Sequence, residues 1–92
     1  MENIGNILLE RGYKPDQAKS TASSLLKLNL QLKPLLEAWI TSFKETNFTV
    51  GDISIFFLME KYGLRYPAAL LTIDWLLREP EKAKEAIKRG IK

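Results

Sequence analysis

The 92-residue chain contains no cysteine and no histidine, and it has neither a glycine-rich phosphate loop nor a cluster of metal-ligating residues. The absence of cysteine excludes a disulfide framework, and with it most small secreted scaffolds. Without histidine or cysteine, catalysis would depend on carboxylates, lysine, tyrosine or an activated hydroxyl. We therefore expect no enzymatic activity and no bound cofactor or metal.

Long hydrophobic runs are also missing, because no segment reaches the ~18 consecutive apolar residues of a membrane span. The N-terminus carries Glu2 where a signal peptide would be positively charged, and its apolar run is short. These features predict a cytoplasmic protein without a membrane segment. With 46% hydrophobic and 27% charged residues, the composition is that of one ordinary globular domain covering residues 1–92.

The formal net charge of +3 is concentrated at the C-terminal end. Residues 1–77 are neutral, whereas residues 78–92 hold six basic side chains against three acidic ones. Acidic residues lead in this tail and basic residues trail, which is the order that complements a helix dipole. The pattern is typical of a solvated terminal helix, and a nucleic-acid contact is the less favoured alternative. The candidates for such a contact are Lys82, Lys84, Lys88 and Arg89.

Prolines and glycines divide the chain into amphipathic segments that predict an all-α, compact bundle of five or six short helices. In the fourth of these segments, Thr49 and Asp52 have the spacing of a capping box before an apolar run. The expected helices cover residues 3–11 (with Asn3 as N-cap and Gly12 as stop), 15–28, 34–47, 49–62, 67–79 and 80–90.

Two segments also fit β-strands. The apolar residues of Leu26–Lys33 alternate at period two, and Phe48–Phe57 fits a hairpin that turns at Gly51–Asp52. Leucine favours helices, so we prefer the all-α fold and keep α+β with a small hairpin as the alternative. Ile7–Arg11 also resembles Phe57–Lys61, which leaves open a repeat of two stacked three-helix units.

The segment Tyr66–Leu77, with the sequence YPAALLTIDWLL, is apolar almost all the way round a helix. Such a helix lies at the centre of a core or against a partner. Its one charged residue, Asp74, precedes Arg78 by one turn, the favourable order for an ion pair. We expect this pair to mark a narrow solvent-facing edge with little effect on stability. The alternative is a carboxylate buried at a junction between elements, where its loss is costly.

Ser23 and Lys27 lie one helical turn apart, which allows a serine–lysine catalytic pair. The neighbouring Ser20, Thr21 and Ser24 instead predict a helix face of small residues. We therefore interpret this segment as structural.

The fourth and fifth expected helices also allow a helix-turn-helix interpretation. The phrase FTVGDIS, residues 48–54, resembles the opening of the first DNA-binding helix in mercury-resistance-type regulators. The resemblance implies that AALLTIDWLL enters the major groove, yet this helix offers no Arg, Lys, Asn or Gln to base edges. A DNA-associated regulator of phage or mobile-element type is therefore the alternative function, with Lys61 and Arg65 joining the C-terminal basic residues in backbone contact.

Residues 48–77 hold more apolar side chains than one part of so short a chain readily covers. Surplus apolar patches on small proteins mark partner sites, and symmetric homodimers are the commonest assembly. We therefore expect a non-enzymatic domain that acts by protein–protein association, including self-association through the fourth and fifth helices, with core packing as the competing explanation. The sequence does not identify a partner. The interface candidates are Phe56, Phe57, Met59, Tyr62, Tyr66, Leu70 and Trp75.

Overall fold

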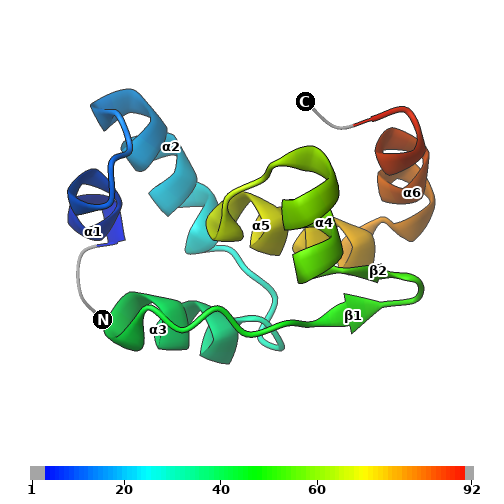
Figure 1. Ribbon diagram of the computed structural model, residues 1–92, viewed down its shortest axis with the longest axis horizontal. Helices are drawn as coiled ribbons and strands as arrows, with labels where there is room; N and C mark the ends of the chain where they lie inside the picture. Colours follow the sequence, from blue (N-terminus) through cyan, green and yellow to red (C-terminus); the bar gives the residue numbers. More distant parts are fainter. Residues whose placement is uncertain (1–3, 91–92) are drawn as a thin grey trace.

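The computed structural model describes residues 4–90, which form six helices and one two-stranded sheet (Figure 1). The expectation of a mostly helical domain of short helices is confirmed. The radius of gyration, 12.7 Å, is close to the ~12 Å of a compact domain of this length. The elements are α1 (Ile4–Glu10), α2 (Pro15–Leu25), α3 (Lys33–Ser42), β1 (Thr49–Val50), β2 (Ile53–Ser54), α4 (Ile55–Tyr62), α5 (Tyr66–Arg78) and α6 (Pro80–Lys88).

Helix α5 runs through the middle of the molecule and contacts α2, α4, α6 and β1 (Figure 1). Seven of its residues are buried, including Leu70, Ile73 and Leu76. The apolar character of this segment is therefore explained mainly by core packing, and little of it is left for a partner. The repeat of two three-helix units stays a prediction.

Proline begins four of the helices, as the sequence predicts, because it occupies the first turn of α2, α3, α5 and α6. Gly12 follows α1 with φ +97°, and Gly63 ends α4 with φ +66°. Both adopt the left-handed conformation that glycine enters without steric cost. The expected N-cap Asn3 lies outside the described residues.

Helix α3 ends at Ser42, five residues before the expected end at Asn47. Phe43 takes φ +55° there, and its N–H donates to the carbonyl of Trp39 at 3.0 Å. The N–H of Lys44 donates to the carbonyl of Ala38 at 3.2 Å, which completes a Schellman-type end. Sequence reasoning missed this end because the left-handed position is held by phenylalanine instead of glycine.

Helix α2 ends at Leu25, three residues earlier than expected, and residues 26–32 link it to α3. The alternating leucines of this link do not form a strand. Leu28 and Leu32 are buried, whereas Leu26 and Leu30 are 63% and 79% exposed. The link turns twice. The N–H of Leu28 donates to the carbonyl of Leu25, and the N–H of Leu32 donates to the carbonyl of Asn29.

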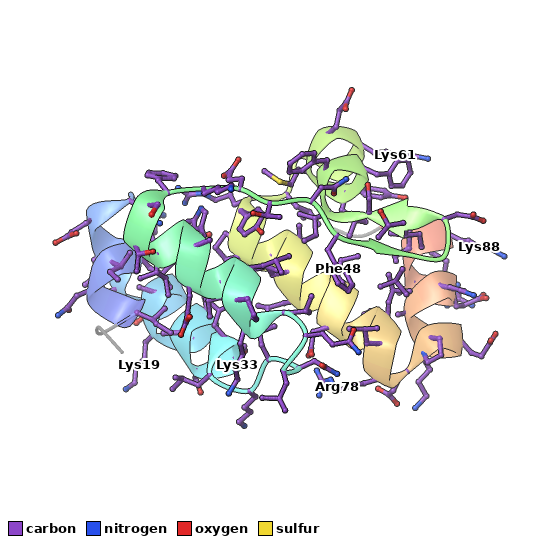
Figure 2. All side chains as sticks on the ribbon, turned by 90° about the horizontal axis from the view of Figure 1, so that it is seen from below. Lys19, Lys33, Phe48, Lys61, Arg78 and Lys88 are labelled. Carbon is purple, nitrogen blue, oxygen red and sulfur yellow. The ribbon has the colours of Figure 1, made fainter. Side chains whose placement is uncertain are left out.

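Residues 49–54 form the hairpin that the sequence left as an alternative, so the expected helix start at Thr49 is wrong. Thr49 pairs with Ser54, and Val50 pairs with Ile53, in an antiparallel register. Gly51 has φ +61° at the first turn position, as a type II′ turn requires. Phe48 packs between this hairpin and α5 (Figure 2), and its carbonyl accepts a hydrogen bond from the N–H of Ile55 at 3.0 Å.

The N-terminus of α4 therefore has different caps from those expected. The hydroxyl of Ser54 accepts a hydrogen bond from the N–H of Phe57 at 3.1 Å, so Ser54 is the N-cap in place of Thr49. The side-chain carbonyl of Asn47 accepts a second bond from the N–H of Phe56 at 3.0 Å. These caps satisfy two of the amide groups that a helix start leaves unpaired.

Asp74 is buried, so its expected place on a solvent-facing edge is wrong. Its side chain is 2% exposed and accepts a hydrogen bond from the backbone N–H of Asn29 at 2.9 Å. A second carboxylate oxygen lies 2.7 Å from the guanidinium of Arg78, which is 62% exposed. The alternative of a carboxylate at a junction is therefore the observed arrangement, and the junction joins α5 to the link between α2 and α3.

Arg11, which directly follows α1, joins the end of that helix to the C-terminal end of α3. Its guanidinium donates to the carbonyls of Trp39 at 2.9 Å and Ile40 at 3.2 Å. The same group stacks 4.2 Å from the Trp39 ring centroid and 4.0 Å from that of Phe43. One cation thus binds two carbonyls in the last turn of α3, where a positive charge also complements the helix dipole.

Candidate functional site

Two of the interface candidates, Tyr66 and Leu70, belong to the core. Both are almost completely buried, at 1% and 0% exposure. The hydroxyl of Tyr66 donates to the carbonyl of Thr46 at 2.7 Å, and its ring stacks on Trp39 with 6.2 Å between centroids. These internal contacts account for the aromatic side chain of Tyr66. Because Tyr66 and Leu70 are buried, neither can form part of an interface surface.

Phe56 and Phe57 lie on the exposed side of α4, at 44% and 40% exposure. Met59 and Tyr62 are half-buried on the same helix, where they pack against the core. Ile55 and Leu58 fill the buried side of this helix. Of the seven interface candidates, these two phenylalanines are the ones that the fold leaves most accessible.

A groove of about 640 Å³ lies between the hairpin, α4 and α6. Phe57, Tyr62 and Ile87 line its apolar part, and Lys61, Lys84 and Lys88 line it with ammonium groups. Figure 2 shows Lys61 of α4 and Lys88 of α6 at the same end of the molecule.

Contacts among the lining residues fix the walls of this groove. The Tyr62 hydroxyl donates to the carbonyl of Ile87 at 2.9 Å, which ties α4 to α6. Phe57 meets Tyr62 edge to face, with 6.4 Å between ring centroids. Lys61 Nζ lies 5.3 Å from the centroid of the Phe57 ring and 5.7 Å from that of Tyr62. The groove is therefore formed by packed aromatic side chains before any ligand arrives.

The four basic residues expected to contact nucleic acid fall into two pairs. Lys82 forms an ion pair with Glu79 at 3.3 Å, and Arg89 pairs with Glu85 at 3.1 Å. The hydrogen bond and charge of Lys82 lower the pKa of Glu79 below its ordinary value. Lys84 and Lys88 line the groove instead. The structure thus brings together two of the four residues and adds Lys61 to them.

The contribution of Lys61 to this site could not be read from spacing along one helix. Lys84 and Lys88 are four residues apart and share a helix face, which the sequence shows directly. Lys61 joins them because α4 and α6 line the same groove and are linked by the hydrogen bond from Tyr62 to Ile87, residues 25 positions apart in the chain. The hairpin wall, with Asp52 and Ile53, is not expected from the preferred all-α interpretation, which places both residues in a helix.

Trp75 lies at another place, in a shallow hollow of about 370 Å³ between α2 and α5. Its indole N–H donates to Glu79 at 3.3 Å. Lys27 lines this same hollow, while Ser23 lines a different one between α1 and α2. Ser23 and Lys27 therefore line different hollows and do not share a site.

The helix-turn-helix interpretation needs α5 to present a free face to DNA. Seven of its thirteen residues are buried, and the outer face carries Leu71, Thr72 and Trp75, which line a surface hollow. The helix-turn-helix interpretation and backbone contact by exposed lysines stay predictions. Within residues 4–90, no group of three or more Asp or Glu residues is placed to hold a metal ion. None of the helices in this range is both long and apolar enough to cross a membrane.

Comparison with known proteins gives no functional assignment. No protein-family model matches the chain, and no curated protein or solved structure is significantly similar to it. The fold and the exposed side chains define the class as a small, mostly helical globular domain.

Proposed function

We propose that this domain has no catalytic role and acts by protein–protein association, including self-association through the exposed face of α4. The composition of that face carries the proposal. Successive helical residues are rotated by about 100°, so Phe56, Glu60, Phe57 and Lys61 follow one another around one exposed arc. Accessible aromatic rings such as the two in this arc are the type of side chain that dominates the binding energy of interfaces.

The same arc is complementary to itself. It carries one carboxylate, Glu60, and one ammonium group, Lys61, beside the two phenylalanines. In a two-fold symmetric dimer the same patch serves both subunits, so apolar area faces apolar area and each charge meets its opposite. A second copy of the chain is therefore the occupant that this face fits.

The direct test is the molar mass from light scattering across a concentration series. We expect the wild-type mass to rise from the monomer value of 10.5 kDa toward twice that value. Phe56→Ser should hold the mass at the monomer value, because it removes the most exposed ring of the arc.

The matched control is Leu30→Ser, since Leu30 is also exposed but lies in the link between α2 and α3. This variant should self-associate like the wild type. A wild-type mass that stays at 10.5 kDa at every concentration would contradict the proposal. So would an equal loss of self-association in Phe56→Ser and Leu30→Ser. The cytoplasm is the proposed location, which the cysteine-free composition supports.

A further inference from the structure

The groove between the hairpin, α4 and α6 has a charge pattern distinct from the rest of α6. Among residues 4–90, no carboxylate lies within ion-pair distance of Lys61, Lys84 or Lys88, whereas Lys82 and Arg89 on the same helix each have one. One carboxylate, that of Asp52, lines the groove beside the three ammonium groups. The groove is therefore net positive, and its cations are available to an external anion.

The floor of the groove is apolar and already ordered. Phe57 is 40% exposed there, and the bond from Tyr62 to Ile87 holds the two helical walls together. A volume of about 640 Å³ is within the usual range for ligand sites. It accommodates a few apolar side chains, and a preformed site avoids the cost of ordering its walls on binding.

We propose that this groove binds an acidic peptide segment of a protein partner, with apolar side chains on Phe57 and Tyr62 and flanking carboxylates at Lys84, Lys88 and Lys61. The proposal rests on the proposed role in protein association and names the chemistry of a second ligand. The combination of an apolar floor with cations on its rim matches a segment in which leucine or phenylalanine stands between aspartate or glutamate residues.

A nucleic acid fits this site less well. Affinity for nucleic acid rises with the number of phosphates that a protein neutralises. Three lysines beside Asp52 offer few cations to a phosphate backbone, and Lys82 and Arg89 are already paired with Glu79 and Glu85. A peptide uses both the apolar floor and the cations, whereas a phosphate backbone uses the cations alone.

The test is fluorescence anisotropy with a labelled hexapeptide that has Leu-Phe at its centre and two acidic residues on each side. A counterpart with Asn and Gln in place of Asp and Glu measures the charge contribution. We expect the acidic peptide to bind about tenfold more tightly than the counterpart, and its affinity to fall as salt is added. Equal binding of the two peptides, or no binding of either, would overturn the proposal.

The variant Lys84→Ala/Lys88→Ala should weaken the acidic peptide about fivefold or more, since two unpaired cations are removed. The matched control Lys82→Ala/Arg89→Ala removes the same net charge from the same helix and should change the affinity less than about twofold. All four side chains are exposed, so both variants retain the core. Equal weakening in the two variants would show a general charge effect and would reject the groove.

A single-stranded oligonucleotide of equal charge supplies the competing ligand. Tighter binding of this oligonucleotide than of the acidic peptide, lost in Lys84→Ala/Lys88→Ala, would overturn the peptide proposal in favour of nucleic acid. Phe57 and Lys61 belong to both the groove and the exposed face of α4, so self-association competes with the peptide. Phe56 does not line the groove, so Phe56→Ser should bind the peptide at least as tightly as the wild type. Self-association of the wild type with no peptide binding by Phe56→Ser rejects the groove alone, and peptide binding by a wild type that stays monomeric rejects self-association alone.

Discussion

The carboxylate of Asp74 accepts a hydrogen bond at 2.9 Å from the backbone N–H of Asn29, which precedes it by 45 residues. This bond fastens the link between α2 and α3 to the central helix. Because Asp74 is buried and Arg78 is mostly exposed, the two members of their ion pair contribute unequally to the fold.

Asp74→Ala should lower the free energy of unfolding by about 2–3 kcal/mol, since it removes a charged acceptor and leaves the Asn29 amide without its partner. For a domain of this size, that corresponds to a fall in melting temperature of roughly 10 °C or more. Arg78→Ala should cost about 1 kcal/mol or less, because water replaces an exposed guanidinium. Thermal unfolding followed by circular dichroism measures both, and equal small effects would return Asp74 to the solvent-facing role expected from the sequence.

The start of α4 gives a second prediction. Ser54→Ala should destabilise the protein by about 1 kcal/mol, because the N–H of Phe57 loses its acceptor. Thr49→Ala serves as the matched control and should cost less than about 0.5 kcal/mol, since Thr49 lies in an exposed position of β1 and caps no helix. Urea unfolding distinguishes the two, and the opposite order would restore the helix start at Thr49.

Arg11 provides a third prediction. Arg11→Lys keeps the charge but loses the forked guanidinium that bonds the carbonyls of Trp39 and Ile40. We expect a loss of about 1–2 kcal/mol in urea unfolding, with a change in Trp39 fluorescence, because the cation stacked on that ring changes shape. Lys14→Arg is a control at an exposed position. Wild-type stability in Arg11→Lys would show that charge alone suffices.

Much of this fold follows from local signals in the sequence. Pro15, Pro34, Pro67 and Pro80 mark helix starts, and the apolar run of α5 marks the core, because both signals act within a few residues. The hairpin does not follow from the sequence in this way, because a capping-box spacing and a turn spacing overlap at residues 49–52 and local pattern does not decide between them.

Long-range contacts explain what local pattern does not predict. Asp74 resembles an ordinary surface ion-pair residue until Asn29 is placed beside it. The groove likewise needs the hydrogen bond of Tyr62 to Ile87 to bring Lys61 toward Lys84 and Lys88. Of the interface candidates, Phe56 and Phe57 are exposed while Tyr66 and Leu70 are buried, a distinction that helix periodicity alone leaves open.

Alkaline pH should destabilise the fold through two tyrosines. Burial raises the pKa of Tyr66 and of Tyr13 above the ordinary value of 10.0, although the charge of Arg65 opposes the shift at Tyr13. The unfolded chain therefore ionises first. The contribution of each tyrosine is complete below pH 10 and is lost as pH rises through the folded-state pKa.

Spectrophotometric titration of phenolate should show two groups that ionise later than free tyrosine. Tyr66→Phe and Tyr13→Phe should each remove one late group and reduce the loss of stability above pH 10. At neutral pH, Tyr66→Phe should lower the free energy of unfolding by about 1 kcal/mol, because it removes the hydrogen bond to Thr46. Tyr13→Phe should leave the free energy of unfolding almost unchanged, because the buried Tyr13 hydroxyl has no hydrogen-bond partner among residues 4–90. Ionisation of Tyr13 and Tyr66 at the pH of free tyrosine would contradict these expectations.

Association through the exposed face of α4 can be followed residue by residue in a concentration series of amide NMR spectra of the wild-type protein. We expect concentration-dependent shifts for Phe56, Phe57, Glu60 and Lys61, with the apolar hollow between α1 and α2 unaffected. Spectra that do not change with concentration, or changes centred on Leu9 and Leu26 of that hollow, would contradict it.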